Sequence, residues 1–184
     1  MSAYDRPAAL EEYRALRATI RQRGTARVAI AVATILGWAA LALTTMALSL
    51  PPLATLAPLL VLAGGFEAVF GLHVGVERVG RYLQVYFEAG VAEPPAWEHV
   101  AMTPRPPGQP SAGVDPLFGV LFLFAAAVNF VPVLLIGVGV ELLVIGTAHV
   151  AFVTRLLVAR RFALSQRQTD LAQMTTLRGQ QDQP

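Results

Sequence analysis

Four long apolar blocks constrain the fold of this chain more than any other feature of its sequence. A bilayer core of roughly 30 Å requires about 20 helical residues, and each block reaches that length. Hydrophobic residues make up 55% of the 184-residue chain and charged residues only 14%, which is typical of membrane proteins. We therefore predict an all-α, four-helix transmembrane bundle with spans at residues 28–50, 53–73, 117–136 and 138–158.

Short breaks join these spans in pairs. Pro51-Pro52 cannot continue the first helix, because proline lacks the backbone donor and clashes with the preceding turn. The glycines of Gly137-Val-Gly139 allow a similarly short reversal between the third and fourth spans. We predict two helical hairpins connected by a Pro-rich loop at residues 90–116, in which Trp97 should anchor the chain at the membrane surface.

Arginines lie at only one end of the predicted hairpins. Short loops rich in arginine usually remain in the cytoplasm. Both termini and the central loop are therefore expected to be cytoplasmic, and the opposite side should expose only the two tight turns. All fourteen basic residues are arginines: Arg6, Arg14, Arg17, Arg21, Arg23, Arg27, Arg78, Arg81, Arg105, Arg155, Arg160, Arg161, Arg167 and Arg178.

Residues 1–27 form an arm ahead of the first span. Apolar side chains recur there at helical spacing, opposite several arginines, which predicts an amphipathic helix. This helix could dock a partner, or it could lie among anionic lipid headgroups, which we favour. Gly24-Thr25 is the expected bend into the membrane. The apolar positions are Leu10, Tyr13, Leu16 and Ile20.

Two further segments leave the spans at the cytoplasmic end. No helix-stopping residue follows the second span, and one helix over residues 53–89 would be about 55 Å long, so residues 74–89 should form a cytoplasmic helix extension. Pro58 either kinks this helix or marks its start. The tail at residues 159–184 is cytoplasmic and polar, and we expect it to fray or to be disordered after Leu164.

The helix extension begins with a charged cluster formed by His73, Glu77, Arg78 and Arg81. Glu77 precedes Arg81 by four residues, the favourable order for an ion pair on one helical face. We predict an interfacial cluster, because solvent and headgroups stabilise charge at that boundary. His73 and Glu77 alone are too few ligands to predict a metal site. Three aromatic residues follow, suited to the interface or to packing against the amino-terminal helix: Tyr82, Tyr86 and Phe87.

Small residues recur along the second span at intervals of three or four. Such spacing lets another helix backbone approach closely. The contact could lie within one chain or between subunits, and the spacing does not distinguish the two. The residues are Gly64, Ala68, Gly71 and Gly75.

Four polar residues interrupt the apolar spans: Glu67, Asn129, Glu141 and His149. Ionisable groups in hydrocarbon are costly and often belong to proton pathways. They can equally fix helix packing through hydrogen bonds, which is the interpretation we favour. By helical rise, Asn129 and His149 should lie at similar depth, so we expect a hydrogen-bonded core there.

Three segments resemble uncharacterised bacterial four-helix integral membrane proteins. They are Tyr13-Arg-Ala-Leu-Arg, Val76-Glu-Arg-Val-Gly-Arg-Tyr-Leu83 and Trp97-Glu98, all within about the first hundred residues. The resemblance implies a four-helix architecture and a bacterial inner membrane. It implies no activity and no catalytic residues.

The sequence favours an interaction or scaffold protein of the inner membrane that acts through its cytoplasmic helices. A small oligomeric channel or transporter for protons or cations, using the intramembrane acids and histidine, is the alternative. No nucleophile elbow, zinc-protease motif or phosphate-binding glycine loop is present, so we expect no enzyme and no cofactor. The expected partners are the lipid bilayer, anionic headgroups, and a second copy or another membrane protein, but not nucleic acid.

Overall fold

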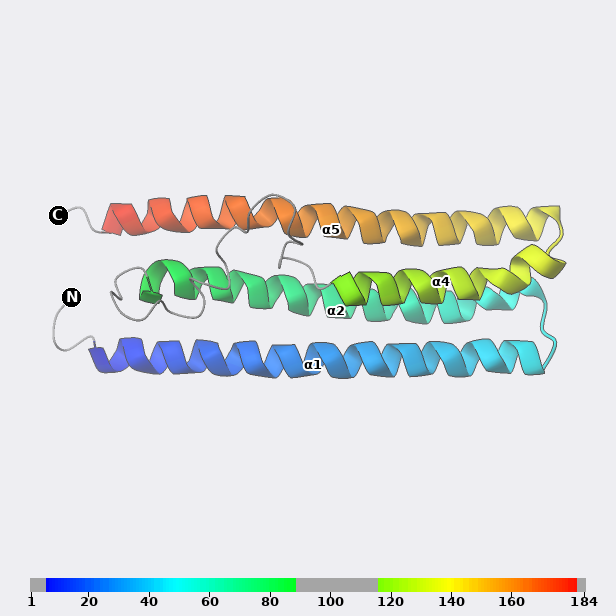
Figure 1. Cartoon of the computed structure of the whole chain (residues 1–184), viewed down its shortest axis with the longest axis horizontal. Coiled ribbons are helices and arrows are strands. Elements are labelled where there is room, and N and C mark those ends of the chain that lie inside the picture. Colours follow the sequence, from blue (N-terminus) through cyan, green and yellow to red (C-terminus); the bar gives the residue numbers. More distant parts are fainter. Residues whose placement is uncertain (1–5, 89–115, 182–184) are drawn as a thin grey trace. The chain divides into compact units, whose positions relative to one another are not determined.

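The computed structural model describes residues 6–88 and 116–181, and the described chain is almost entirely helical (Figure 1). Four of its helices are long and apolar enough to cross a membrane. The predicted all-α bundle of two hairpins is confirmed, and the chain is a multi-pass membrane protein. Trp97 and the Pro-rich loop lie outside the described residues. The elements are α1 (Arg6–Ala47), the 3-10 turn η1 (Pro52–Thr55), α2 (Leu56–Leu83), the π-helical turn η2 (Gln84–Glu88), α4 (Pro116–Ile136) and α5 (Gly139–Gln181).

The first hairpin turns through a left-handed residue at the end of α1. Ser49 has a φ of 49°. The Ser49 N–H donates to Met46 O (3.1 Å), and the Leu50 N–H donates to Thr45 O (3.0 Å). These two bonds form a Schellman motif, which satisfies carbonyls that the helix end would otherwise leave unpaired. Pro51 then prevents the helix from continuing, as predicted.

The start of α2 resolves the role of Pro58. The regular helix begins at Leu56, so Pro58 lies in its first turn, where a missing N–H removes no helical hydrogen bond. The proline therefore belongs to the helix start. From there α2 runs to Leu83 and continues as η2 to Glu88, which confirms the predicted extension of the second helix.

Two local expectations were wrong. The helix α1 runs without interruption through Gly24 and Thr25, so no break separates the amino-terminal arm from the span. The tail is helical as far as Gln181. Its less exposed residues recur at helical spacing, and Asp170 among them is buried. A polar segment can stay ordered in this way because its buried polar group has a charged partner, described below.

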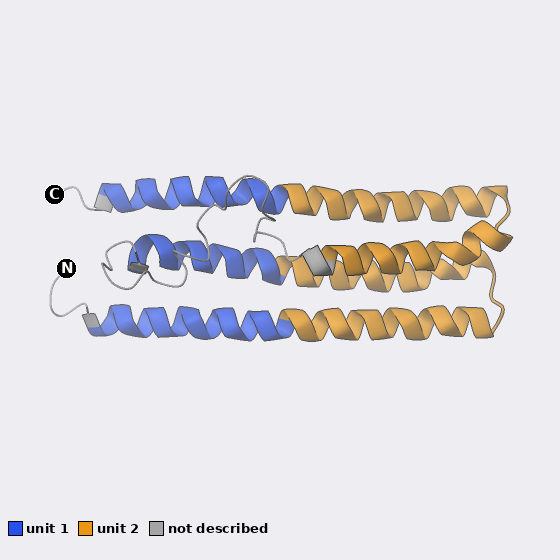
Figure 2. Cartoon of the chain, viewed as in Figure 1, with its two compact units in different colours: residues 1–26, 72–114, 162–184 blue, residues 27–71, 115–161 orange. Residues whose placement is uncertain are grey.

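The chain divides into two compact units (Figure 2). Unit 1 comprises residues 1–26, 72–114 and 162–184, and unit 2 comprises residues 27–71 and 115–161. The described part of unit 1 contains the ends of α1, α2 and α5. Unit 2 contains parts of all four helices.

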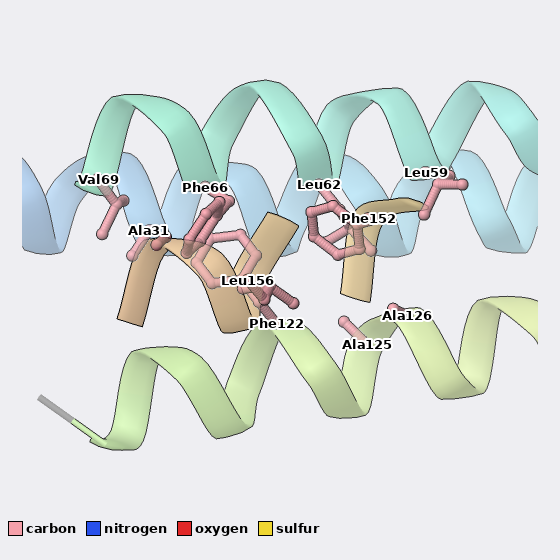
Figure 3. Close-up of a cluster of buried hydrophobic side chains, with 11 residues drawn as sticks. Ala31, Leu59, Leu62, Phe66, Val69, Phe122, Ala125, Ala126, Phe152 and Leu156 are labelled. Atoms are coloured by element: carbon pink, nitrogen blue, oxygen red, sulfur yellow. The ribbon is translucent and has the colours of Figure 1, made fainter. Parts of the chain in front are cut away.

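The core of unit 2 is built around aromatic rings (Figure 3). Phe66 of α2 lies edge-on to Phe122 of α4, with ring centroids 5.6 Å apart, and to Phe152 of α5 at 6.2 Å. Buried alanines on α1, α4 and α5 belong to the same cluster. The buried cluster consists of Ala31, Leu59, Leu62, Phe66, Val69, Phe122, Ala125, Ala126, Phe152, Leu156 and Ala159.

Candidate functional site

A buried arginine forms the centre of unit 1. Arg81 is only 1% exposed. Its Nη2 donates to Asp170 Oδ2 of α5 at 3.0 Å, and its Nη1 donates to Glu77 Oε2 at 3.4 Å. The predicted Glu77–Arg81 pair is therefore present, but the shorter bond goes to an acid 89 residues further along the chain. The ion pair joins the extension of α2 to the tail of α5.

The four residues of the predicted interfacial cluster have different surroundings. His73 and Arg81 are buried, Glu77 is partly buried and Arg78 is exposed. Arg78 is thus the member of this set that is available on the surface of unit 1. Asp170 was missed because the tail was expected to be disordered, although the helical spacing of its apolar residues was a readable signal.

The amino-terminal part of α1 packs against the aromatic end of α2. The Tyr82 hydroxyl donates to Glu12 Oε1 at 2.9 Å. The rings of Tyr13 and Phe87 lie 5.7 Å apart. Of the two roles proposed for the aromatic residues, packing against the amino-terminal helix is therefore confirmed.

Arg178 links the carboxyl-terminal end of α5 to the π-helical turn η2 through a hydrogen bond. Its guanidinium donates to the Val85 carbonyl. A π-helical turn departs from the regular α-helical bonding pattern. An arginine reaching the turn from a neighbouring helix gives one of its carbonyls a charged donor. The described ends of α1, α2 and α5 in unit 1 are thus joined by polar contacts.

Asn129 is the centre of a hydrogen-bonded network in unit 2. Its Nδ2 donates to the Thr55 carbonyl at 2.9 Å and lies 3.2 Å from His149 Nε2. Its Oδ1 accepts from Trp38 Nε1 at 3.3 Å. The amide thus links α1, η1, α4 and α5. The prediction that Asn129 and His149 share a level and form a hydrogen-bonded core is confirmed.

The second nitrogen of His149 fixes the tautomer. His149 Nδ1 lies 2.8 Å from the Ile145 carbonyl, which can only accept a hydrogen bond. Nδ1 therefore carries the proton, and Nε2 accepts from the Asn129 amide. Every polar side-chain atom of Asn129 and His149 has a partner in this arrangement, and the ring needs no charge to make its bonds.

Glu67 pairs with an arginine of α5. Arg155 Nη2 donates to Glu67 Oε2 at 2.7 Å, while 41% of the Arg155 side chain and 47% of the Glu67 side chain remain exposed. The Arg155 guanidinium also lies 5.3 Å from the centroid of the Phe70 ring. This ion pair was not predicted. The only sequence signal was the presence of opposite charges in two apolar blocks, and the sequence does not show which blocks are neighbours.

Glu141 acts at the start of α5. Its Oε2 accepts a hydrogen bond from the Val138 N–H at 3.5 Å. Val138 is the N-cap of α5 and Glu141 is its third helical residue, so this is the contact that the acid of a capping box makes. Glu67 and Glu141 thus have partners other than Asn129 and His149. Within the described part of the chain, the four intramembrane polar residues do not form one continuous hydrogen-bonded path.

The fold defines the class: a multi-pass, four-helix membrane protein with two internal polar centres. No protein-family model, curated protein or solved structure matches the chain. The bacterial family resemblance of the first hundred residues therefore stays a prediction, and the architecture rests on the structure. Among the residues described, no group of three or more histidine, cysteine or acidic side chains could hold a metal ion.

Proposed function

We propose that this chain is a non-enzymatic interaction or scaffold protein of a bacterial inner membrane, and that it acts through unit 1. Arginine placement favours a cytoplasmic position for this unit. The observation that carries the proposal is the buried bond between Arg81 and Asp170, which orders two polar segments that follow apolar spans.

The ordering of these two polar segments suits a unit that docks a partner protein. Burying an ion pair costs desolvation, so its clearest benefit is a defined geometry. The geometry here holds the polar ends of α2 and α5 in fixed register and leaves other charges on the surface. Arg14, Arg21 and Arg78 are exposed on the same unit and would meet an acidic partner surface.

The hydrogen bonding inside unit 2 favours the scaffold function over proton or cation transport. The Asn129 network joins neutral groups whose hydrogen bonds are already made. A relay needs groups that exchange protons along a connected path. Glu67 and Glu141 are engaged with Arg155 and with the start of α5 instead.

A charge reversal on unit 1 tests the scaffold function. The Arg78→Glu variant should lose at least one protein that co-purifies with the native chain from its own membranes, because the reversal changes the surface and leaves Arg81 in place. The measurement is quantitative mass spectrometry after mild detergent extraction. Leu143→Ala, at an exposed position of α5 within unit 2, is the control and should retain all partners. Recovery of the native chain alone would refute the proposal.

A flux measurement tests the alternative function. Liposomes containing the native chain should show no more proton or cation flux than empty liposomes, and Glu67→Gln should leave that result unchanged. The reason is the closed hydrogen bonding of the Asn129 network. Flux through the native chain that Glu67→Gln abolishes would establish the transport function and exclude the scaffold proposal as the main activity.

A further inference from the structure

The Glu67–Arg155 ion pair lies on the outer surface of unit 2, at a depth where hydrocarbon is expected. Thr34 of α1 is the contact of Gly65 on α2, which places Glu67 near the level of Val32. Val32 is five residues, or about 7 Å, inside the level of Arg27, where the apolar part of α1 begins. A half-exposed ion pair at this depth would face lipid, which stabilises charge poorly.

Within residues 6–88 and 116–181, the small residues beside Glu67 are not used for packing. A methyl group added at Gly64 or Gly71 would have no heavy atom within 4 Å, and Ala68 is exposed. Gly65 differs, because a methyl group there would overlap the Thr34 side chain. The contact between α1 and α2 therefore uses Gly65, and no described residue fills the space beside the neighbouring glycines.

We propose that two copies of this chain associate through the Glu67 face, defined as Gly64, Glu67, Ala68 and Gly71 of α2 with Arg155 of α5. Copies inserted with the same topology present the same residues at the same depth. A two-fold axis along the membrane normal can then bring the acid of one copy to the arginine of the other. The open small residues allow the backbones to approach closely.

This arrangement gives each charged group a second partner of opposite sign. Within one copy, Arg155 makes one bond to Glu67 and retains exposed surface. In the pair of copies, that surface would meet the carboxylate of the neighbour. The two glutamates and two arginines of the pair would then form ion pairs with one another, and protein rather than lipid would cover them. The inference concerns unit 2 alone and does not depend on the function proposed for unit 1.

Cysteine cross-linking tests the contact directly, because the native chain contains no cysteine. In oxidised native membranes, Ala68→Cys should form disulfide-linked dimers several-fold more efficiently than Val32→Cys. Val32 is a matched control, since it is exposed on α1 at a similar level. Equal cross-linking by the two variants would overturn the proposal. The absence of cross-links at residue 68 would also overturn the proposal. It would indicate that a lipid or a different membrane protein covers this face.

Complementary charge reversals test the pairing. A Glu67→Arg chain and an Arg155→Glu chain should each self-associate less than the native chain. Co-expressed with different tags, they should co-purify more efficiently than either does with itself, because one face is basic and the other acidic. Equal recovery of mixed and like pairs would contradict the proposed geometry.

A third variant avoids any loss of the internal ion pair. Ala68→Leu adds volume at an exposed position and should reduce dimerisation without lowering the stability of the single chain. Ala33→Leu, at an exposed position of α1, is its control and should leave dimerisation unchanged. Native-like dimerisation of Ala68→Leu, measured by single-molecule photobleaching in liposomes, would refute close packing at this face.

Discussion

Replacing Arg81 with leucine is expected to destabilise unit 1 by about 3 to 5 kcal/mol, the range for removing one partner of a buried ion pair. The variant leaves the Asp170 carboxylate buried without its arginine, and Glu77 loses its ion-pair partner. Amide hydrogen exchange of the helical tail, residues 162–181, measures the effect. Exchange there should accelerate strongly, while exchange in unit 2 should change little.

Two variants separate loss of the ion pair from loss of positive charge. Arg78→Leu removes an arginine from the exposed surface three residues away and should change stability by no more than about 0.5 kcal/mol. Combining Arg81→Leu with Asp170→Leu should restore much of the loss, since the more deeply buried of the two carboxylates is removed together with its arginine. If Arg78→Leu and Arg81→Leu had equal effects, the buried pair would not be what orders the tail.

The Asn129→Leu variant is expected to destabilise unit 2 by about 2 to 5 kcal/mol. Three partners lose a hydrogen bond, and such bonds in membrane proteins contribute about 0.6 kcal/mol on average and at most about 1.7 each. Unfolding in mixed micelles with increasing denaturing detergent measures the change. Trp38→Phe removes only one of the bonds and should have a clearly smaller effect.

The control for Asn129 is its neighbour on α4. Val128→Leu alters an exposed apolar side chain and should be almost neutral. An Asn129→Leu variant no less stable than Val128→Leu would show that the network contributes nothing to the bundle. A loss equal to that of Trp38→Phe would show that the bonds to Thr55 and His149 carry no energy.

Much of the fold could be predicted because membranes restrict what a chain can do. Span length follows from bilayer thickness, and Pro51-Pro52 and Gly137-Val-Gly139 stop helices for local reasons. The shared level of Asn129 and His149 follows from helical rise alone. These features depend on residues close in sequence, or on distance along a helix axis.

The remaining features depend on which helices are neighbours. Asp170, the closer partner of Arg81, is 89 residues away, and Arg155, the partner of Glu67, is 88 residues away, so no local pattern pairs them. The tail looks too polar to fold by itself, and its order depends on Asp170 meeting Arg81. Glu141 was read as an intramembrane acid because its role as a helix cap depends on where α5 begins.

The Asn129 network also bears on how the chain is made. Its donor and acceptor in the first hairpin, Trp38 and Thr55, are 91 and 74 residues ahead of Asn129. They are synthesised before α4 leaves the ribosome. When α4 enters the bilayer, its one buried amide therefore finds bonding groups already present, and the arrival of His149 completes the set. The order of synthesis therefore allows two of the three hydrogen bonds of Asn129 to form as soon as α4 packs against the first hairpin.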